Sequence, residues 1–593
     1  MVTPLLTLVQ RRALRAASSS ARRSLSLVSG GGSGTRRPAA VAAPSAAPVY
    51  KNPFLHIQEQ QDEPDLEPLL SLAPSYELYP NDVHCFLGLN GSGKSRFLNQ
   101  LQQSADSQAQ RGGNSDRRRC RISSLSLDAH REFVARHGEK VVANVLGGVG
   151  SPSARDLIVR LGLYPVWESH VKHLSTGEMR KLMLAETLLK VPRANVLILD
   201  QPFDGLDVAA RKQLEWMLGQ LTRGFTRLLV QTGGRNDANA YRTQVLLVAN
   251  RLEQVFPDIL THMVLLRKQD GSSDTTSVST TNESTNLELL PCQVDEEAEA
   301  EKDALFSQLH SFLDEEHRKR PQMTESEMIS IIQELFDCQQ QHLQPGTTHQ
   351  QQAPAIELRQ VSISYDNKRV LLDTINFARH RHEHWVLLGP NGSGKSSLMR
   401  VLMQTPGHGL TAGDVYVGSD NMLHATDKKI GAVSTDQHIQ LLHQSVLLQE
   451  DQEAGGVTSD KMTKKTHTPT AFDLILEHAK SIEKAHLAAK LLNLPMDAIH
   501  TRSLSELSQG EQKLVLIART LAACPEVLIL DEITHGLDPF NRAHVLRVVN
   551  AIGEFANSAT HLILITHHED EIVDCFTGVF EIRDKQLVER AVA

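Results

Sequence analysis

Two short apolar runs that each end in aspartate stand out in the hydrophobic pattern of the chain. Val196–Asp200 and Val527–Asp531 both read Val-Leu-Ile-Leu-Asp, and each is followed by a Gly-Leu-Asp that ends at Asp207 or Asp538. A continuous apolar run of this length is typical of a strand buried on both faces of a parallel sheet. The pattern therefore predicts an internal repeat of roughly 300 residues in which buried strands end in carboxylates.

A second pair of apolar runs leads into glycine-rich loops. Val83–Leu87 precedes Gly88–Ser95, Trp385–Leu388 precedes Gly389–Ser396, and both loops read G-x-x-x-x-G-K-S. Backbone N–H groups of such a P-loop close on phosphate oxygens. The residues expected around the phosphates are Gly88, Asn90, Gly91, Gly93, Lys94 and Ser95 in the first loop, and Gly389, Asn391, Gly392, Gly394, Lys395 and Ser396 in the second.

Helical spacing follows both loops, over residues 96–103 and 397–403, and the N-terminus of a helix adds positive potential for an anion. Polar stretches, Ser104–Arg119 and Gln449–His467, interrupt the two units, and the basic run Arg117–Arg119 is expected to be a solvated loop rather than a nucleic-acid contact. The lysine of each P-loop is expected to meet the β- and γ-phosphates of a nucleotide. Magnesium ligands are expected from the loop serine and the strand aspartate, which are Ser95 with Asp200 and Ser396 with Asp531.

Strands that alternate with helical patterns predict an α/β fold with two tandem P-loop domains, each built on a mixed β core. The expected organisation is a leader at 1–51, a first ATP-binding domain at 52–268, an acidic linker at 269–353 and a second ATP-binding domain at 354–593. Within the linker, residues 287–342 are helix-prone, with apolar residues at helical spacing around Leu309 and Ile332. These helices could dock a partner, but packing on a neighbouring domain of the same chain is the favoured interpretation.

Composition narrows the function classes. A net charge of −9 over 593 residues argues against a general nucleic-acid coat. The six cysteines form no C-x-x-C pair, which disfavours a zinc site or a disulfide framework and favours a reducing compartment. No apolar run approaches the ~18 residues that a membrane-spanning helix needs.

The first 58 residues contain no Asp or Glu, and they interleave arginines with Ser, Ala and Leu. This composition is typical of a transit peptide, and we expect a mitochondrial location. The alternatives are a plastid presequence and a plain basic tail on a cytoplasmic protein, which could be peripheral at a membrane.

The segments before the acidic strands identify a family. Leu174–Glu178 reads Leu-Ser-Thr-Gly-Glu and Leu507–Glu511 reads Leu-Ser-Gln-Gly-Glu. With the P-loops and acidic strands, they resemble the ABC ATPases, whose L-S-G-G-Q/E signature leads into a helix. The resemblance implies a helical signature subdomain in each unit and head-to-tail pairing, so that ATP lies between the P-loop of one unit and the signature of the other. Soluble tandem ATPases of the bacterial ModF-like type have a similar arrangement.

The resemblance also implies roles within two composite sites. At the second P-loop, Glu532 polarises the attacking water, His567 contacts the γ-phosphate and Lys395 assists catalysis, while Tyr365 stacks on adenine. This site is completed by Ser175, Gly177 and Glu178. The first P-loop site is completed by Ser508, Gly510 and Glu511. Asp207 and Asp538, which end the two Gly-Leu-Asp segments, are further candidates for nucleotide binding.

The two sites are expected to be unequal. Gln201 replaces Glu532 in the first copy, and an amide keeps the size of the side chain but loses its basicity. The histidine position is filled by Asn250, because Val245–Arg251 aligns with Leu562–His568 better than Leu228–Gly233 does. The family's lid glutamine is also altered, with Gln437 and His130 as candidates. The first site should therefore bind MgATP and turn it over slowly.

Three roles fit a tandem ATPase without membrane spans. The favoured role is an ATP-hydrolysing subunit for a separate membrane permease. A ribosome- or nucleic-acid-associated ATPase is less favoured, because acidic residues of the linker outnumber the basic ones, Lys302, Arg318, Lys319 and Arg320. The third role is a regulator in which nucleotide binding gates docking of the linker helices.

Overall fold

The computed structural model places all the residues that it describes in one compact unit, Asp65–Ala593. The predicted leader therefore lies outside the described part. The described residues are 70–72, 76–78, 83–111, 121–147, 158–174, 176–189, 196–203, 208–222, 244–251, 260–268, 285–291, 299–319, 323–337, 354–365, 369–389, 393–403, 409–418, 420–421, 430–454, 469–556 and 559–590.

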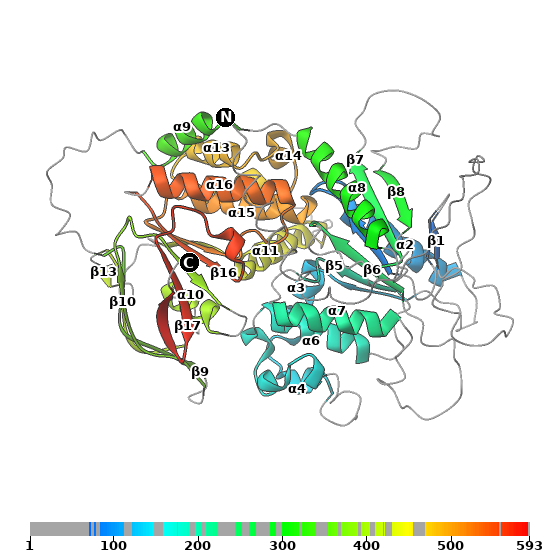
Figure 1. Ribbon diagram of the computed structural model, residues 1–593, viewed down its shortest axis with the longest axis horizontal. Coiled ribbons are helices and arrows are strands. Elements are labelled where there is room, and N and C mark those ends of the chain that lie inside the picture. The colour runs from blue at the N-terminus through cyan, green and yellow to red at the C-terminus, as the bar shows by residue number, and fades with distance from the viewer. Residues whose placement is uncertain are drawn as a thin grey trace, which may run out of the picture. The chain divides into compact units, whose positions relative to one another are not determined.

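Each half of the chain is built on a six-stranded sheet (Figure 1). The first has the order β4 (Ile122–Leu125), β5 (Val196–Asp200), β6 (Gln244–Ala249), β3 (Val83–Leu87), β7 (His262–Lys268) and β8 (Thr285–Pro291). The second has the order β14 (Ile430–Val433), β15 (Val527–Asp531), β16 (His561–Thr566), β11 (Trp385–Leu388), β17 (Gly578–Arg583) and β18 (Gln586–Arg590).

The two sheets correspond strand by strand. In each, neighbouring strands run parallel except for the last, which pairs antiparallel with its neighbour. The internal repeat and the mixed α/β core predicted from the apolar runs are therefore confirmed. Both acidic strands lie inside their sheets, which explains why they are continuously apolar.

Helices follow the strands at the expected places, with two corrections in length. α2 (Lys94–Arg111) and α10 (Lys395–Leu402) begin at the P-loop lysines. The helix expected at 96–103 extends to Arg111, into the first polar stretch, and α11 (Thr435–Ala454) likewise covers the start of the second polar stretch. Polarity alone does not end a helix. Residues 104–111 contain no Gly or Pro, and glycines first appear at 112 and 113.

The remaining helices form the helical part of each half. In the first half these are α3 (Leu127–His137), α4 (Val142–Val145), α6 (Thr176–Leu189) and α7 (Val208–Thr222). In the second they are α12 (Ala471–Leu476), α13 (Ile482–Leu491), α14 (Met496–Thr501), α15 (Gln509–Ala522) and α16 (Pro539–Phe555). Among the described helices, none combines the length and the apolarity needed to cross a membrane.

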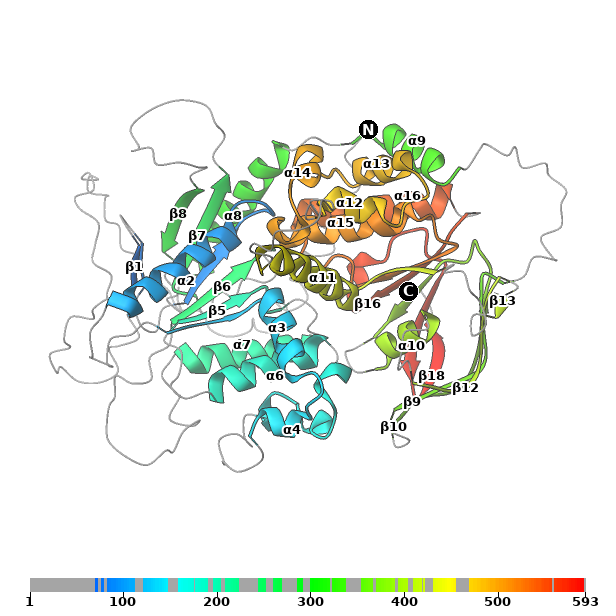
Figure 2. The ribbon, with the colours of Figure 1, turned by 180° about the vertical axis from the view of Figure 1, so that it is seen from behind.

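An antiparallel sheet accompanies the second half. It has the order β10 (Arg369–Arg379), β9 (Ile356–Tyr365), β12 (Leu410–Val417) and β13 (Asp420–Asn421), and its strands lie together in Figure 2. Its buried face shares a core with the strand and helix on either side of the P-loop, through Trp385 and Leu398. In the first half, the strands described before β3 are β1 (Leu70–Leu72) and β2 (Tyr76–Leu78), which pair with each other.

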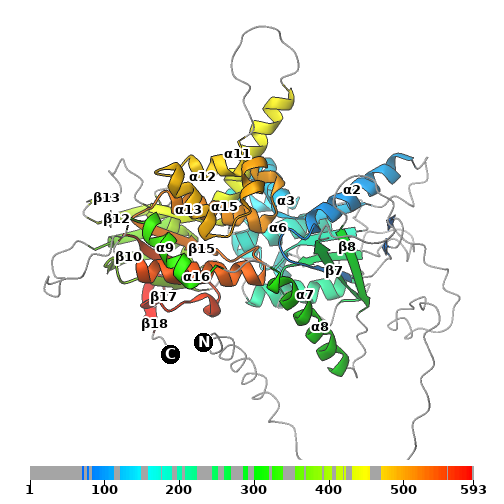
Figure 3. The same ribbon diagram turned by 90° about the horizontal axis from the view of Figure 1, so that it is seen from above.

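The predicted linker is divided between the two halves. Leu287–Pro291, which we expected to be helical, is part of β8 and pairs with β7, so this prediction was wrong. The leucines at 287 and 289 fit an edge strand, and the edge of β7 is better satisfied by a backbone partner. α8 (Glu299–Arg318) lies beside β7 (Figure 3), and Phe312 of α8 and Leu265 of β7 line the same pocket.

α9 (Glu325–Leu335) belongs to the second half. A capping box between Thr324 and Glu327 starts it, and Met328, Ile331, Ile332 and Leu335 are buried on its inner face. These side chains join the core that includes α13 and α16, while Leu309 and Phe312 of α8 join the core of the first half. The expectation that the linker helices pack on their own protein is confirmed. Below, "first half" means β1 to α8 and "second half" means α9 to β18.

Ile332→Ala should lower the melting temperature of the second half. Ile332 is 0% exposed, and truncating a buried isoleucine typically costs ~2–5 kcal/mol. Ser330→Ala, on the exposed side of the same helix, is the control. Differential scanning calorimetry measures both, and equal melting temperatures would show that α9 is not anchored to this core.

Candidate nucleotide sites

The two P-loops are held by their own lysines. Lys94 Nζ donates hydrogen bonds to the carbonyl oxygens of Gly88 and Leu89, and Lys395 Nζ donates to Gly389 O (2.7 Å). Gly93 and Gly394, with φ of 95° and 104°, turn the chain into the helix in a conformation that side chains disfavour. Both lysines are buried. Each is also the first residue of the helix that follows, so every P-loop has an ammonium group and a helix N-terminus at its end. Asn391 and Gly392 lie outside the described residues.

The ends of the two acidic strands have the same backbone and different side chains. Glu532 has a φ of 48° and Gln201 one of 50°, and both conformations are unusual for residues other than glycine. Glu532 N donates to Ile565 O (2.9 Å), and Gln201 N donates to Val248 O (3.0 Å) on the corresponding neighbouring strand. Glu532 and Gln201 therefore differ in their side chains, a carboxylate and an amide, but share the same backbone conformation and strand pairing.

Two histidines hold the Glu532 carboxylate. His567 Nδ1 lies 3.2 Å from Glu532 Oε1, and His535 Nδ1 lies 3.0 Å from Oε2. Burial raises the pKa of Glu532, but the charges and hydrogen bonds of His535 and His567 outweigh it and hold that pKa well below its ordinary value. Glu532 is thus kept as a carboxylate.

Asp531 has the opposite tendency. Burial and then the neighbouring Glu532 carboxylate raise the pKa of Asp531 to about 7, against the attraction of Lys513 and Lys395. A divalent cation favours the ionised form of such a carboxyl group. The serine hydroxyl and aspartate oxygens of each half are the hard ligands that Mg²⁺ prefers, so the residues present fit this ion.

The first P-loop lies against the second half of the chain. Asn90 N donates to Asp538 Oδ2 (2.9 Å), and Asn90 Nδ2 donates to Gly536 O (3.2 Å). A Cβ on Gly510 would lie 1.7 Å from Asn90 Nδ2, so only glycine permits this approach. The P-loop of one half and the signature of the other are therefore brought together, as the head-to-tail arrangement requires.

Further hydrogen bonds join the halves around the first site. Gln509 Nε2 donates to Asp200 Oδ2 (3.3 Å), and Asn250 Nδ2 donates to Gly536 O (3.1 Å). Arg251, which the sequence did not single out, donates to the carbonyl oxygens of Thr534 and Leu537. At the signature itself, Ser508 caps α15 and exchanges hydrogen bonds with Glu511.

Strand order supports the alignment chosen for Asn250. It follows β6, which lies between β5 and β3, as His567 follows β16 between β15 and β11. The competing segment at 228–233 is not among the described residues.

The second composite site is described only in part. Lys395, Ser396, Asp531, Glu532 and His567 surround the ends of β11, β15 and β16. In the signature of the first half, Gly177 is buried and Glu178 half-buried in the first turn of α6, whereas Ser175 and Asp207 lie outside the described residues. Tyr365 ends β9, but its side chain is not described, so stacking on adenine stays a prediction.

The lid candidates occupy different positions. His130 corresponds to His438 rather than to Gln437, because each histidine lies eight residues after the start of β4 or β14. His438 Nε2 donates to Gln512 Oε1 (3.0 Å) of the signature helix. Burial is the main cause that lowers the pKa of both histidines to about 4, with help from Arg180 at His130 and Lys513 at His438.

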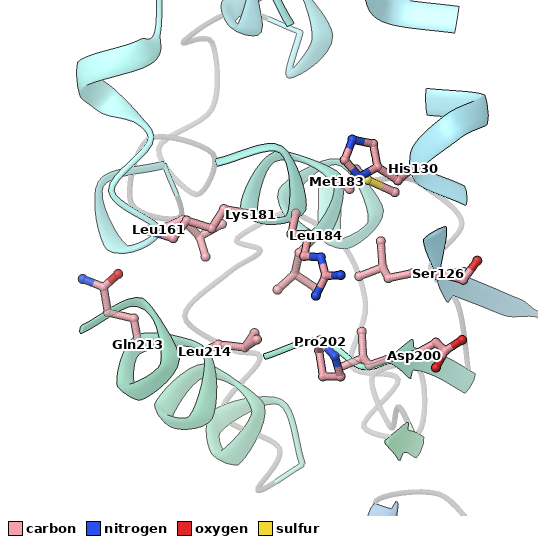
Figure 4. A pocket seen from close by; sticks show the side chains of 13 residues that line it. Ser126, His130, Leu161, Lys181, Met183, Leu184, Asp200, Pro202, Gln213 and Leu214 are labelled. Carbon is pink, nitrogen blue, oxygen red and sulfur yellow. The ribbon is translucent and has the colours of Figure 1, made fainter. Parts of the chain in front are cut away.

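A pocket in the first half is separate from the P-loops (Figure 4). It lies between α3, α6 and α7, and its lining includes the magnesium candidate Asp200 and the lid candidate His130 but no residue of either P-loop. Its wall is mostly apolar, formed by residues such as Leu161, Met183, Leu184 and Leu214. It is therefore not the place where nucleotide phosphates would bind.

Known proteins share these features. The family described as ABC transporter matches residues 73–204 and 372–535, which include both P-loops, both signatures and both acidic strands. The chain belongs to this family. The head-to-tail contacts at Asn90 and the paired mixed sheets are thus those of a tandem ABC ATP-binding protein.

Two relatives and one solved structure illustrate the similarity. The chain is 27% identical to the ABC transporter ATP-binding protein ModF of Escherichia coli (strain K12), over 86% of this chain and 92% of that protein. It is 32% identical to the uncharacterized ABC transporter ATP-binding protein YmeB of Lactococcus lactis subsp. lactis (strain IL1403), over 40% of this chain and 85% of that protein. A chain from a model of ribosome-bound archaeal Pelota and ABCE1 superimposes with a TM-score of 0.46 and 16% identity, covering 86% of this chain and 75% of that one.

Acid should destabilise the second half through His438. Its pKa falls from the ordinary 6.5 to about 4 on folding, so the unfolded chain binds more protons between these values. The stability that the neutral ring contributes is full above pH 6.5 and is lost as the pH falls towards 4, by ~3 kcal/mol at ~1.4 kcal/mol per pKa unit. In His438→Gln, urea denaturation between pH 7 and pH 4 should show a smaller loss of stability. His486→Gln, at an exposed histidine, is the control, and an unchanged pH slope for His438→Gln would contradict the assignment.

Proposed function

We propose that the chain binds two molecules of MgATP between its halves and hydrolyses ATP mainly at the second P-loop. The observation that carries this proposal is the pair Glu532 and Gln201, which occupy the same left-handed backbone position with different side chains. A carboxylate at this position can orient and polarise a water molecule, whereas an amide lacks the basicity.

The residues of the second site divide the work. Lys395 and the N-terminus of α10 bind the β- and γ-phosphates, and His567 contacts the γ-phosphate from the end of β16. Glu532, kept ionised by His535 and His567, holds the water in line with the phosphorus. Magnesium, where bound by Ser396 and Asp531, neutralises charge on the phosphate oxygens.

The first site is proposed to hold nucleotide and stabilise the paired state. Its P-loop contacts Asp538 and Gly536 through Asn90, and Gln509 reaches Asp200 from the opposite half. Asn250 donates a hydrogen bond to Gly536 O of the second half. These groups suit the binding of a nucleotide at an interface better than rapid cleavage.

Single-turnover hydrolysis should separate the two sites. Glu532→Gln should slow phosphate release by about 10²–10⁴-fold, the usual contribution of a general base. Gln201→Ala, at the equivalent position, should retain most of the activity. In the matched lysine pair, Lys395→Ala should abolish turnover and Lys94→Ala should largely preserve it. Similar losses in both members of either pair would contradict the proposed asymmetry.

We further propose that ATP-driven closure powers a separate membrane permease, and that the protein is mitochondrial. The permease role is supported by the similarity to ModF, whose name describes an ABC transporter ATP-binding protein, along nearly its whole length. The acidic linker supports it indirectly, because phosphate backbones attract Lys and Arg rather than carboxylates. The acid-free, arginine-containing first 58 residues support the mitochondrial location.

Trapping the closed state should identify the partner. Glu532→Gln purified by affinity from its native cells with ATP should retain a membrane permease, because slow hydrolysis prolongs closure. Lys395→Ala, which should not close at this site, is the control. Recovery of ribosomes or nucleic acid with Glu532→Gln but not with Lys395→Ala would favour a ribosome- or nucleic-acid-associated ATPase instead. If wild-type protein hydrolyses ATP but neither variant retains a partner, the permease role is contradicted.

A further inference from the structure

Three histidines cluster beside the candidate catalytic carboxylate. His535 lies in the turn after β15, and His567 and His568 follow β16. One ring nitrogen from each lies within 4.8 Å of those from the other two. The ring centroids of His567 and His568 are 4.0 Å apart, and those of His535 and His567 are 5.4 Å apart. The proposed ATPase mechanism uses His567 at the γ-phosphate and His535 beside the Glu532 carboxylate, so it leaves His568 and the closeness of the three rings unexplained.

The Glu532 carboxylate is placed as an orienting group for two of the rings. Its two oxygens lie 3.0 Å from His535 Nδ1 and 3.2 Å from His567 Nδ1. Metal-binding histidines commonly donate one ring N–H to a carboxylate, which sets the ring orientation and raises the basicity of the other nitrogen. The His567 ring is 5% exposed, and its Nε2 is buried without a hydrogen-bond partner among the described residues.

A buried carboxylate ties the two loops together. Glu571, which is 0% exposed, accepts hydrogen bonds from the hydroxyls of Thr534, on the loop of His535, and Thr566, next to His567. Thr566 Oγ1 in turn accepts a hydrogen bond from His568 N (3.0 Å). The three imidazoles are therefore positioned by supports that do not depend on a ligand, as a metal site requires.

We propose that His535, His567 and His568 bind one divalent transition-metal ion such as Zn²⁺, with the Glu532 carboxylate beside them, and that the bound ion stops ATP hydrolysis. Imidazole nitrogens suit Zn²⁺, which favours four ligands, whereas Mg²⁺ prefers oxygen and does not compete for these rings. The inhibitory part rests on the proposed function. A metal-bound His567 no longer meets the γ-phosphate, and Glu532 is drawn towards the cation instead of the attacking water.

The first half offers no equivalent cluster. In the sequence, Gln201 corresponds to Glu532 and Asp204 to His535. Asn250 corresponds to His567 and Arg251 to His568. None has an imidazole, and the Arg251 cation is occupied with the carbonyl oxygens of Thr534 and Leu537. One ion per chain is therefore expected, at the half that hydrolyses ATP.

Isothermal titration calorimetry tests binding directly, with Zn²⁺ added to the nucleotide-free full-length protein. Wild-type protein should bind one ion, and Co²⁺ in its place should give the visible absorption of a tetrahedral site. His568→Ala should bind at least about 10-fold more weakly, because a ligand is lost. His486→Ala, at an exposed histidine on α13, should bind as wild type does. If His568→Ala does not fold, as judged by its melting temperature in chelator, His568→Gln replaces it. Unchanged affinity in the folded His568 variant would overturn the site.

Hydrolysis assays test the inhibitory part separately. Zn²⁺ should inhibit wild-type turnover reversibly, with recovery on adding chelator, and His568→Ala should need at least about 10-fold more Zn²⁺ for the same fractional inhibition of its own metal-free rate. Binding of one ion without inhibition would overturn the regulatory part and keep the site. Absence of turnover in metal-free wild type would refute the proposed ATPase function, while the calorimetric result would still decide the metal site.

Discussion

The hydrogen bond from Glu532 N to Ile565 O is the constraint on which the catalytic end of the second half depends. It fixes the residue after β15 to the neighbouring strand β16 in a left-handed conformation. That conformation turns the carboxylate towards His567, which follows the same neighbouring strand. The strands therefore determine where the carboxylate and the histidine meet, and the loops only complete the contact. A strained backbone position is retained where the surrounding sheet over-determines it.

The first half has the same backbone hydrogen bond at the corresponding position but a different side chain. Gln201 keeps the bond to the neighbouring strand and the left-handed conformation, but its side chain is a neutral amide. The nearby polar groups have been redirected to the other half, since Asn250 and Arg251 bond to the turn that contains Gly536. The same backbone arrangement in the first half thus carries side chains that contact the second half. Two halves with matching sheets therefore differ in the side chains at the ends of corresponding strands.

Close approach between the halves depends on the absence of a side chain. Gly510 lies so near Asn90 that any Cβ would collide with the amide, and Asn90 is also bonded to Asp538. A side chain at Gly510 would be unfavourable for two reasons. It would obstruct the approach of an anion to the N-terminus of α15, and it would collide with the P-loop of the first half. α8 packs on the core of the first half and α9 on that of the second, so each half includes one of the linker helices.

The sequence by itself determined the repeat, the α/β class, the P-loops, the signatures and the exchange of Glu532 for Gln201. These features depend on local order, since a buried strand, a glycine-rich turn and a helix start each have a characteristic pattern within a few residues. The extent of α2 and the strand at Leu287–Pro291 were mispredicted because polarity and helix propensity say little about what a segment packs against. Only the tertiary structure brought Glu532 and His535, which are close in sequence, beside the adjacent pair His567 and His568. They are placed by the pairing of β15 with β16, and such long-range hydrogen bonding leaves no signal in the spacing of residues along the chain.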